Sequence, residues 1–154
     1  MRQLAGLGRS FRCALRGIAC CIKEERNLRI HLAAAGGVLG LGGICRLPAG
    51  EWALLILLIA LVLCAELVNS AVERAVDLAC SGYHALARDA KDIAAGAVLV
   101  TAAAAVVIGL LLFLRPQGVG RLLCVIRERP LVFWPCALGY GVCALAFVFG
   151  AGKR

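Results

Sequence analysis

Charged and aromatic residues are scarce in this sequence. Of its 154 residues only 17% are charged and 6% aromatic, whereas 62% are hydrophobic and the mean hydropathy is +0.92. A soluble domain of this length cannot bury so large an apolar fraction around one core, so a soluble globular fold is excluded. The alternation of apolar and polar residues that a membrane β-barrel requires is also missing. The composition predicts an integral membrane protein with a single helical domain.

Several familiar motifs are missing as well. The sequence has neither the GxxxxGK[ST] loop of P-loop proteins nor the Gly-rich loop of protein kinases, which excludes both of these nucleotide-binding folds. Its nine cysteines include no CxxC pair, and most lie in or beside apolar segments, so we interpret them as packing residues. The first thirty residues contain no long apolar run with a cleavage site after it, so we expect no signal peptide.

Positive charge is in excess, with a net charge of +8 and an isoelectric point near 9.3. With four membrane crossings and the N-terminus inside, twelve of the 17 Lys and Arg residues, within residues 2–29, 74–91 and 153–154, lie on the cytoplasmic side. Basic residues accumulate on that side of membrane proteins and attract anionic lipids. The charge therefore predicts that both termini are cytoplasmic, and it requires no nucleic-acid partner.

The order of segments predicts an all-α membrane protein. Residues 1–30 are basic and carry apolar positions at 4, 7, 11, 15 and 18, the spacing of an amphipathic helix on the membrane surface. Residues 31–114 contain three spans, within 32–48, from 52 through 65 with a polar continuation, and 93–114. Residues 115–130 form a basic linker. Residues 131–154 contain a fourth spanning helix and a tail, and Pro135 favours a kinked or loosely packed helix.

A stripe of polar residues at the end of the second span is the most informative feature. In ELVNSAVERAVD, at one residue per 100°, the five polar residues Glu66, Asn69, Ser70, Glu73 and Asp77 fall on one face of the helix. The stripe could merely pack against polar residues of other helices. However, two carboxylates at positions 66 and 73 repel each other unless a cation lies between them, and a carboxylate at the membrane boundary requires a partner. The stripe therefore favours a functional site.

Two further charged clusters lie on the same side of the membrane, KEERNLRIH at 23–31 and SGYHALARDAKD at 81–92. Either cluster alone is typical of a solvated helix face. Together with the stripe they combine several carboxylates with Lys and Arg, which is the set of groups that binds a polyphosphate with Mg²⁺.

The three motifs resemble those of a known family. ERNLRIH at 25–31, ELVNSAVERAVD at 66–77 and YHALARDAKDIAAGAVLV at 83–100 are similar to the bacterial integral-membrane lipid kinases, the diacylglycerol kinase and undecaprenol kinase family. The resemblance runs in continuous order over residues 9–114. It implies a surface helix and three spans per subunit, a homotrimer, and active sites that draw on neighbouring subunits. The fourth span and its linker lie outside this pattern.

The resemblance also implies roles for individual residues. Glu66 matches the catalytic carboxylate, which accepts the proton of a lipid hydroxyl as it attacks the γ-phosphorus of ATP. Glu25 and Glu73 match the carboxylates that hold Mg²⁺. The implied nucleotide-binding residues are Arg9, Glu25, Glu73, Tyr83, His84, Lys91 and Asp92, and those that bind the lipid or support the site are Arg29, Asn69, Ser70 and Asp77. Cys13 departs from the best-known diacylglycerol kinases of the family, which have an aromatic residue at this position near the nucleotide.

The leading hypothesis is therefore an ATP- and Mg²⁺-dependent kinase of a membrane lipid alcohol, with its active site on the cytoplasmic face of a bacterial cell membrane. The form RNLRIH of the first motif favours undecaprenol over diacylglycerol as the acceptor. The alternatives are a small transporter or channel and a non-catalytic membrane scaffold. A transporter requires polar residues through the whole bilayer, and residues 52–65 offer none.

Overall fold

The computed structural model describes residues 2–80 and 82–150, which form six helices and no strand. Four of these helices are long and apolar enough to cross a membrane, so the prediction of an all-α membrane protein is confirmed. The candidate spans are α2, α3, α4 and α6, while α1 and α5 are shorter or more polar. The bounds are α1 Arg2–Glu24, α2 Arg26–Cys45, α3 Ala49–Ala79, α4 Ala85–Phe113, α5 Pro116–Glu128 and α6 Pro130–Gly150.

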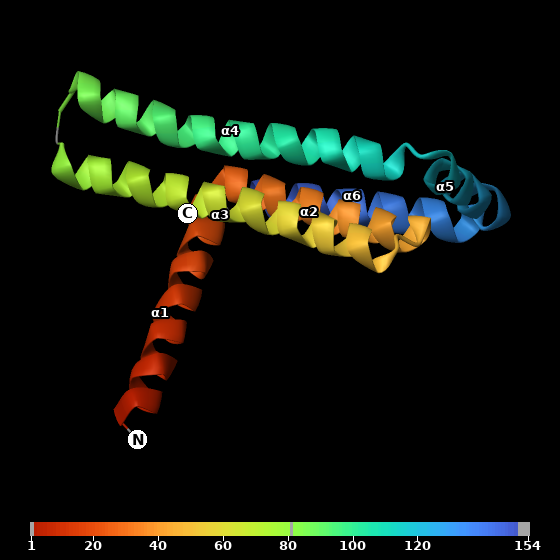
Figure 1. Cartoon of the computed structure of the whole chain (residues 1–154), viewed down its shortest axis with the longest axis horizontal. Helices are drawn as coiled ribbons and strands as arrows, with labels where there is room; N and C mark the ends of the chain where they lie inside the picture. The colour runs from red at the N-terminus through yellow and green to blue at the C-terminus, as the bar shows by residue number, and fades with distance from the viewer. Residues whose placement is uncertain (1, 81, 151–154) are drawn as a thin grey trace.

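The four long helices lie roughly antiparallel in one bundle, with α3 packed against α4 and α2, and α6 packed against α2 (Figure 1). We call the end with the α3–α4 turn the hairpin end and the end with α5 the clamp end. At 1.5 Å per residue, α3 and α4 are about 46 and 44 Å long, whereas α2 is only about 30 Å long. The hairpin of α3 and α4 therefore extends well past the start of α2 (Figure 1).

Helix α1 points away from the bundle (Figure 1) and leaves one apolar face uncovered. The side chains of Leu7, Phe11 and Leu15 are more than half exposed. An exposed apolar stripe on a basic helix is typical of a helix that lies in the membrane interface. This geometry fits the amphipathic surface helix expected from the sequence.

The surface helix ends earlier than residue 30. Helix α1 ends at Glu24, Glu25 is extended with φ −94° and ψ 113°, and Arg26 already begins the first span. The break is stabilised by Arg29, whose side chain is only 3% exposed. Its Nη1 donates to the carbonyl oxygens of Ile22 at 3.1 Å and Lys23 at 2.9 Å, which belong to the last turn of α1 and have no partner within that helix.

The same guanidinium also holds the end of α6, because its Nε donates to the carbonyl oxygen of Val148 at 3.1 Å. Helix C-termini carry partial negative charge. The buried positive charge of Arg29 therefore lies between the C-terminal turns of two helices. Farther along the seam between α2 and α6, the hydroxyl of Tyr140 donates to the carbonyl of Ala33. Gly36 permits this approach, since a Cβ there would lie 2.9 Å from the Tyr140 hydroxyl.

The basic linker predicted at 115–130 is largely a helix, α5, which clamps the α2–α3 turn. Pro116 is in its first turn, where a missing N–H has no cost. Arg121 Nη1 donates to the carbonyl of Cys45 at 2.6 Å and to that of Arg46 at 3.1 Å, and so caps the end of α2. Arg115 pairs with Glu51 in the first turn of α3. Two of the four arginines of this segment, Arg115 and Arg121, thus have structural partners in addition to their effect on topology.

We expect Arg121→Ala to destabilise the bundle, because it leaves the last carbonyls of α2 without a charged donor. A lost hydrogen bond from a charged group costs about 1.5–3 kcal/mol, which lowers the Tm of a chain of this size by about 3–12 °C. Thermal unfolding in detergent micelles measures the effect. Arg127→Ala removes the same charge from the same helix and is the control; an equal fall in Tm for both variants would contradict the clamp.

Candidate active site

The polar stripe on α3 faces into the protein at the level where α2 begins. Glu66 is 3% exposed, Asn69 8% and Ser70 2%, whereas Glu73 is half-buried and Asp77 is exposed. Glu66 lies 17 residues, or about 26 Å, along α3 from its start. This is close to the thickness of the hydrocarbon layer of about 30 Å. The buried carboxylate is therefore near the membrane boundary at the hairpin end.

Several groups surround Glu66. Glu25, Glu73 and His31 all lie close enough to interact with its carboxylate electrostatically. The break between α1 and α2 brings Glu25 to this point, because a continuous helix would carry position 25 away along α1. The structure thus brings together the three carboxylates that the sequence analysis singled out. His31 is an addition, since a lone histidine at the start of a span gives no signal of its own.

Hydrogen bonds within α3 fix the side chains of the stripe. Asn69 Nδ2 donates to Glu73 Oε1 at 3.0 Å, and Ser70 Oγ donates to the backbone carbonyl of Glu66 at 3.0 Å. Asn69 Oδ1 is buried and has no hydrogen-bond partner among the described residues. A buried acceptor without a partner is costly, so this oxygen is suited to a donor or cation that binds at the site.

Arg74 links α3 to the α1–α2 junction, by which we mean residues 22–29. Its Nη2 lies 3.1 Å from Glu24 Oε2 and 3.6 Å from Glu25 Oε1, and its Nη1 donates to the sulfur of Cys20 at 3.6 Å. The sequence analysis did not include Arg74 among the site residues. Its position directly after Glu73 could have indicated a role at the site, because Arg74 lies on the edge of α3 that faces Glu24 and Glu25.

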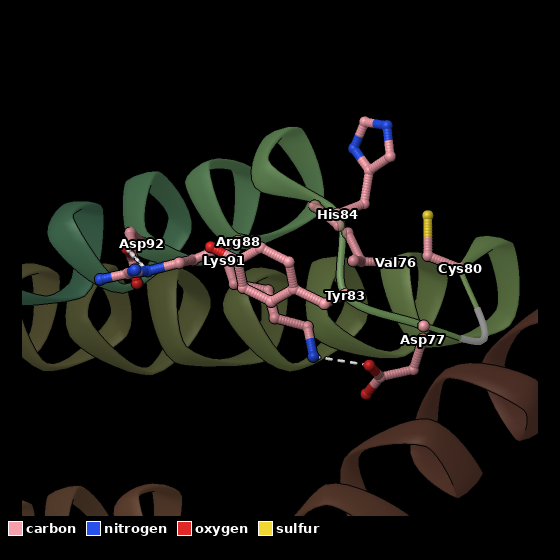
Figure 2. A pocket seen from close by; sticks show the side chains of 10 residues that line it. Val76, Asp77, Cys80, Tyr83, His84, Arg88, Lys91 and Asp92 are labelled. Atoms are coloured by element: carbon pink, nitrogen blue, oxygen red, sulfur yellow. Dashed lines mark hydrogen bonds and ion pairs between the residues drawn. The ribbon is translucent and has the colours of Figure 1, made fainter.

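A second group of predicted residues lines a cavity of about 270 Å³ at the turn between α3 and α4 (Figure 2). Lys91 Nζ pairs with Asp77 Oδ1 at 2.5 Å, and Arg88 pairs with Asp92 at 3.5 Å. The ring of His84 points away from the pair of Lys91 and Asp77 (Figure 2). This cavity is exposed to solvent and offers both cationic and acidic groups. Asp77, Tyr83, His84, Lys91 and Asp92 all contribute to its lining.

A second cavity, of about 430 Å³, is apolar and lies among α2, α3 and α4. Its lining runs along the spans between two residues: His31, on the side of the hairpin end, and Leu114, at the clamp end. The side chains between these two are almost all aliphatic and include Ala35, Val38, Leu58, Val62, Ala102 and Val106. Because its lining on α3 includes Val62 and Leu63, which lie within about one helical turn of Glu66, this apolar cavity ends close to the buried carboxylate.

Comparison with known proteins identifies the family of the chain. Residues 12–113 match the family described as prokaryotic diacylglycerol kinase. The chain belongs to this family. It is 46% identical over 106 residues to an undecaprenol kinase of Bacillus subtilis, a match that covers 69% of the chain and 86% of the relative. It is 44% identical over 108 residues to a diacylglycerol kinase of Synechocystis sp., covering 70% of the chain and 62% of the relative.

Membership of the prokaryotic diacylglycerol kinase family makes the chain a lipid kinase, which was the leading hypothesis from the sequence. A diacylglycerol kinase of Helicobacter pylori is a more distant relative, 37% identical over 84 residues, or 54% of the chain and 66% of the relative. No solved structure gives a significant match. Helices α5 and α6 lie beyond the matched residues 12–113.

One residue expected from the family resemblance is not near the others. Arg9 is on α1, 15 residues before Glu24, which corresponds to about 22 Å along the helix axis. Because α1 points away from the bundle, the single chain does not bring Arg9 to Glu66 or to the cavity at the α3–α4 turn (Figure 1).

The side chains at the site suit a magnesium ion bound together with a nucleotide. Among the described residues, no group of three or more His, Cys, Asp or Glu side chains could hold a metal on its own. Glu25 and Glu73 offer two carboxylates, and Asn69 Oδ1 is an oxygen acceptor without a partner. Mg²⁺ is typically bound by one or two carboxylates, with phosphate oxygens and water as its other ligands. The donor set therefore fits a metal that arrives with a polyphosphate.

We expect Arg74→Ala to lower the rate of lipid phosphorylation about tenfold, because Glu24 loses a charged hydrogen bond and Glu25 loses an ion pair that orient them. Arg74→Lys retains the positive charge and should restore part of the rate. Initial rates in mixed micelles measure both variants. Arg127→Ala at the clamp end is the matched control and should behave as the wild type. An Arg74→Ala variant with the wild-type rate would show that the bridge is not needed.

Proposed function

We propose that this lipid kinase transfers the γ-phosphate of ATP, bound with Mg²⁺, to the hydroxyl of a membrane lipid alcohol, and that it prefers undecaprenol to diacylglycerol. One observation carries the proposal. A buried carboxylate, Glu66, lies where an apolar cavity within the spans meets a cluster of acidic and basic groups outside them. A lipid-soluble acceptor and a water-soluble donor can meet at that point.

In the proposed mechanism the lipid chain lies in the apolar cavity and its hydroxyl lies beside Glu66. Glu66 accepts the hydroxyl proton as the oxygen bonds to the γ-phosphorus and the bond to the β-phosphate oxygen breaks, leaving ADP. His31 lies within electrostatic range of the same carboxylate. Ser70 and Asn69 hold the helix and Glu73 in place through their hydrogen bonds.

Glu25 and Glu73 would hold the metal, with the unpaired oxygen of Asn69 as a further ligand. When bound, Mg²⁺ would neutralise part of the negative charge of the ATP phosphates. The remaining nucleotide contacts come from Lys91, Asp92, Tyr83 and His84 at the α3–α4 turn, where Asp77 holds Lys91.

The position of α1 supports a homotrimer. Arg9 is remote from the site of its own chain, so a nucleotide contact from Arg9 requires the α1 helix of a neighbouring subunit. The uncovered apolar face of α1 and the exposed aliphatic residues of α4, such as Leu99 and Leu111, leave surfaces for such neighbours in the membrane.

The location follows from charge. We place the hairpin end on the cytoplasmic face of a bacterial cell membrane, because most of the Lys and Arg residues lie in α1, the α3–α4 hairpin and the C-terminal tail. ATP is then available to the site from the cytoplasm. The clamp end, with α5, faces the opposite side.

Undecaprenol as the preferred acceptor rests on the first motif, RNLRIH at 26–31, and on the apolar cavity. That cavity is one continuous space along the spans, which suits a single long isoprenoid chain. The identities of 46% and 44% to relatives named for the two different lipids do not separate them.

We expect purified protein in mixed micelles to transfer label from γ-labelled ATP to undecaprenol, with kcat/KM at least about threefold above that for diacylglycerol. Glu66→Gln is the inactive control and should lose about 10²- to 10⁴-fold in rate, the contribution of a general base. Label in neither lipid would refute the proposal. Equal or higher kcat/KM with diacylglycerol would refute the preference for undecaprenol, and a Glu66→Gln variant that keeps its rate would remove Glu66 from the role of base.

The metal assignment has its own test. Glu25→Gln and Glu73→Gln each remove a negative ligand, so the Mg²⁺ concentration that gives half-maximal rate should rise about tenfold or more in each variant. Titration of the rate with Mg²⁺ at fixed ATP measures this. Glu128→Gln on α5 is the control for loss of a carboxylate. Unchanged Mg²⁺ dependence in both site variants would show that neither carboxylate holds the metal.

A further inference from the structure

Helix α6 lies outside the residues that match the family, yet its last turn meets the α1–α2 junction. The carbonyl of Val148 accepts a hydrogen bond from Arg29 Nε at 3.1 Å, and Val148 itself is only 7% exposed. Next to it, the guanidinium carbon of Arg26 lies 5.2 Å from the centre of the Phe149 ring. The end of α6 therefore contacts two arginines of the first family motif.

The position of α6 along α2 is also fixed. The Tyr140 hydroxyl donates to the Ala33 carbonyl, and the ring lies against Gly36 and Gly37. Tyr140 and Val148 are eight residues apart, or about 12 Å along α6. Two separate contacts thus determine where the last turn of α6 lies relative to Arg29.

Arg29 passes this constraint to the acidic cluster. Its Nη1 holds the carbonyls of Ile22 and Lys23, the residues that lead directly into Glu24 and Glu25. Glu24 and Glu25 in turn face Arg74 on α3. A guanidinium that is almost fully buried cannot exchange a lost partner for water without rearranging. Loss of the Val148 carbonyl therefore has to shift Arg29, and with it the junction that carries Glu25.

We propose that α6 is a positioning element of the nucleotide site and that Arg29 is the positioning residue through which it acts. The inference rests on the proposed role of Glu25 in holding Mg–ATP. It assigns Arg29 to the support of the site through backbone carbonyls, with no contact to the lipid. A helix that only filled space would contact α2 through apolar side chains, and its last turn would not hold a buried charge.

The test uses a chain that stops after Ala146, which removes the last turn of α6 but leaves 17 helical residues, still enough for a short span. A chain that stops after Gly150 is the matched control. We expect the first to raise the KM for Mg–ATP about tenfold, the effect of one lost hydrogen bond to a charged group. The KM for the lipid and the kcat at saturating Mg–ATP should stay within about twofold of the wild type, since Glu66 and the apolar cavity are untouched.

Arg29→Lys in the full chain is the second variant, because a lysine keeps the charge but cannot bridge two helix ends in the same geometry. It should raise the KM for Mg–ATP in the same way. Amide hydrogen exchange provides a measurement that needs no activity: the amides of residues 22–29 should exchange faster in both variants than in the control. Faster exchange together with the selective change in KM supports the proposal.

Wild-type KM for Mg–ATP and wild-type exchange at 22–29 in both variants would overturn it. An equal loss in kcat and in both KM values would overturn it as well, because that pattern indicates general destabilisation. If the wild type phosphorylates neither lipid, the proposed function fails. The exchange measurement then still decides whether α6 holds the junction, and unchanged exchange refutes the inference on its own.

Discussion

The arrangement of the helices depends on one buried cation, the guanidinium of Arg29. Three backbone carbonyls, from the ends of α1 and α6, share its donors. The carbonyls of Ile22 and Lys23 have no partner within α1, and backbone carbonyls at the edge of a membrane cannot all reach water. By satisfying them, Arg29 allows the chain to stop one helix and begin another with only Glu25 between them. That break turns α1 away from the bundle and places Glu25 beside the stripe on α3.

The site also depends on the different lengths of the helices. Helix α2 is close to the length that a bilayer requires, whereas α3 and α4 are about ten residues longer and extend at the same end. Their extra turns carry carboxylates, Lys91 and the α3–α4 turn out of the apolar layer, while Glu66 remains at its edge. The same two helices therefore line both the apolar cavity and the polar cavity.

Sequence patterns predicted the spans and the stripe, because hydrophobic length and helical periodicity are properties of one helix at a time. Glu66, Asn69 and Ser70 are buried on one face, as the spacing indicated. Contacts between different helices leave no comparable periodic pattern in the sequence. Arg29 and Val148 are 119 positions apart, and Arg74 is 50 positions from Glu24, so nothing local pairs them. The topology rule already accounts for basic residues next to a span. The sequence therefore gives no separate indication that Arg121 and Arg29 cap helix ends.

The clamp at α5 has a consequence for motion. Arg115 and Arg121 join the start of α3 and the end of α2 to the segment after α4, so three spans are tied together at that end of the bundle. At the other end α3 and α4 are held together by an exposed ion pair and a short turn, and exposed pairs are weak. The tip of the α3–α4 hairpin is therefore less strongly held than the clamp end, and this tip is where we propose that the nucleotide binds. Exchange of small molecules with the aqueous phase requires no loosening of the helices within the lipid.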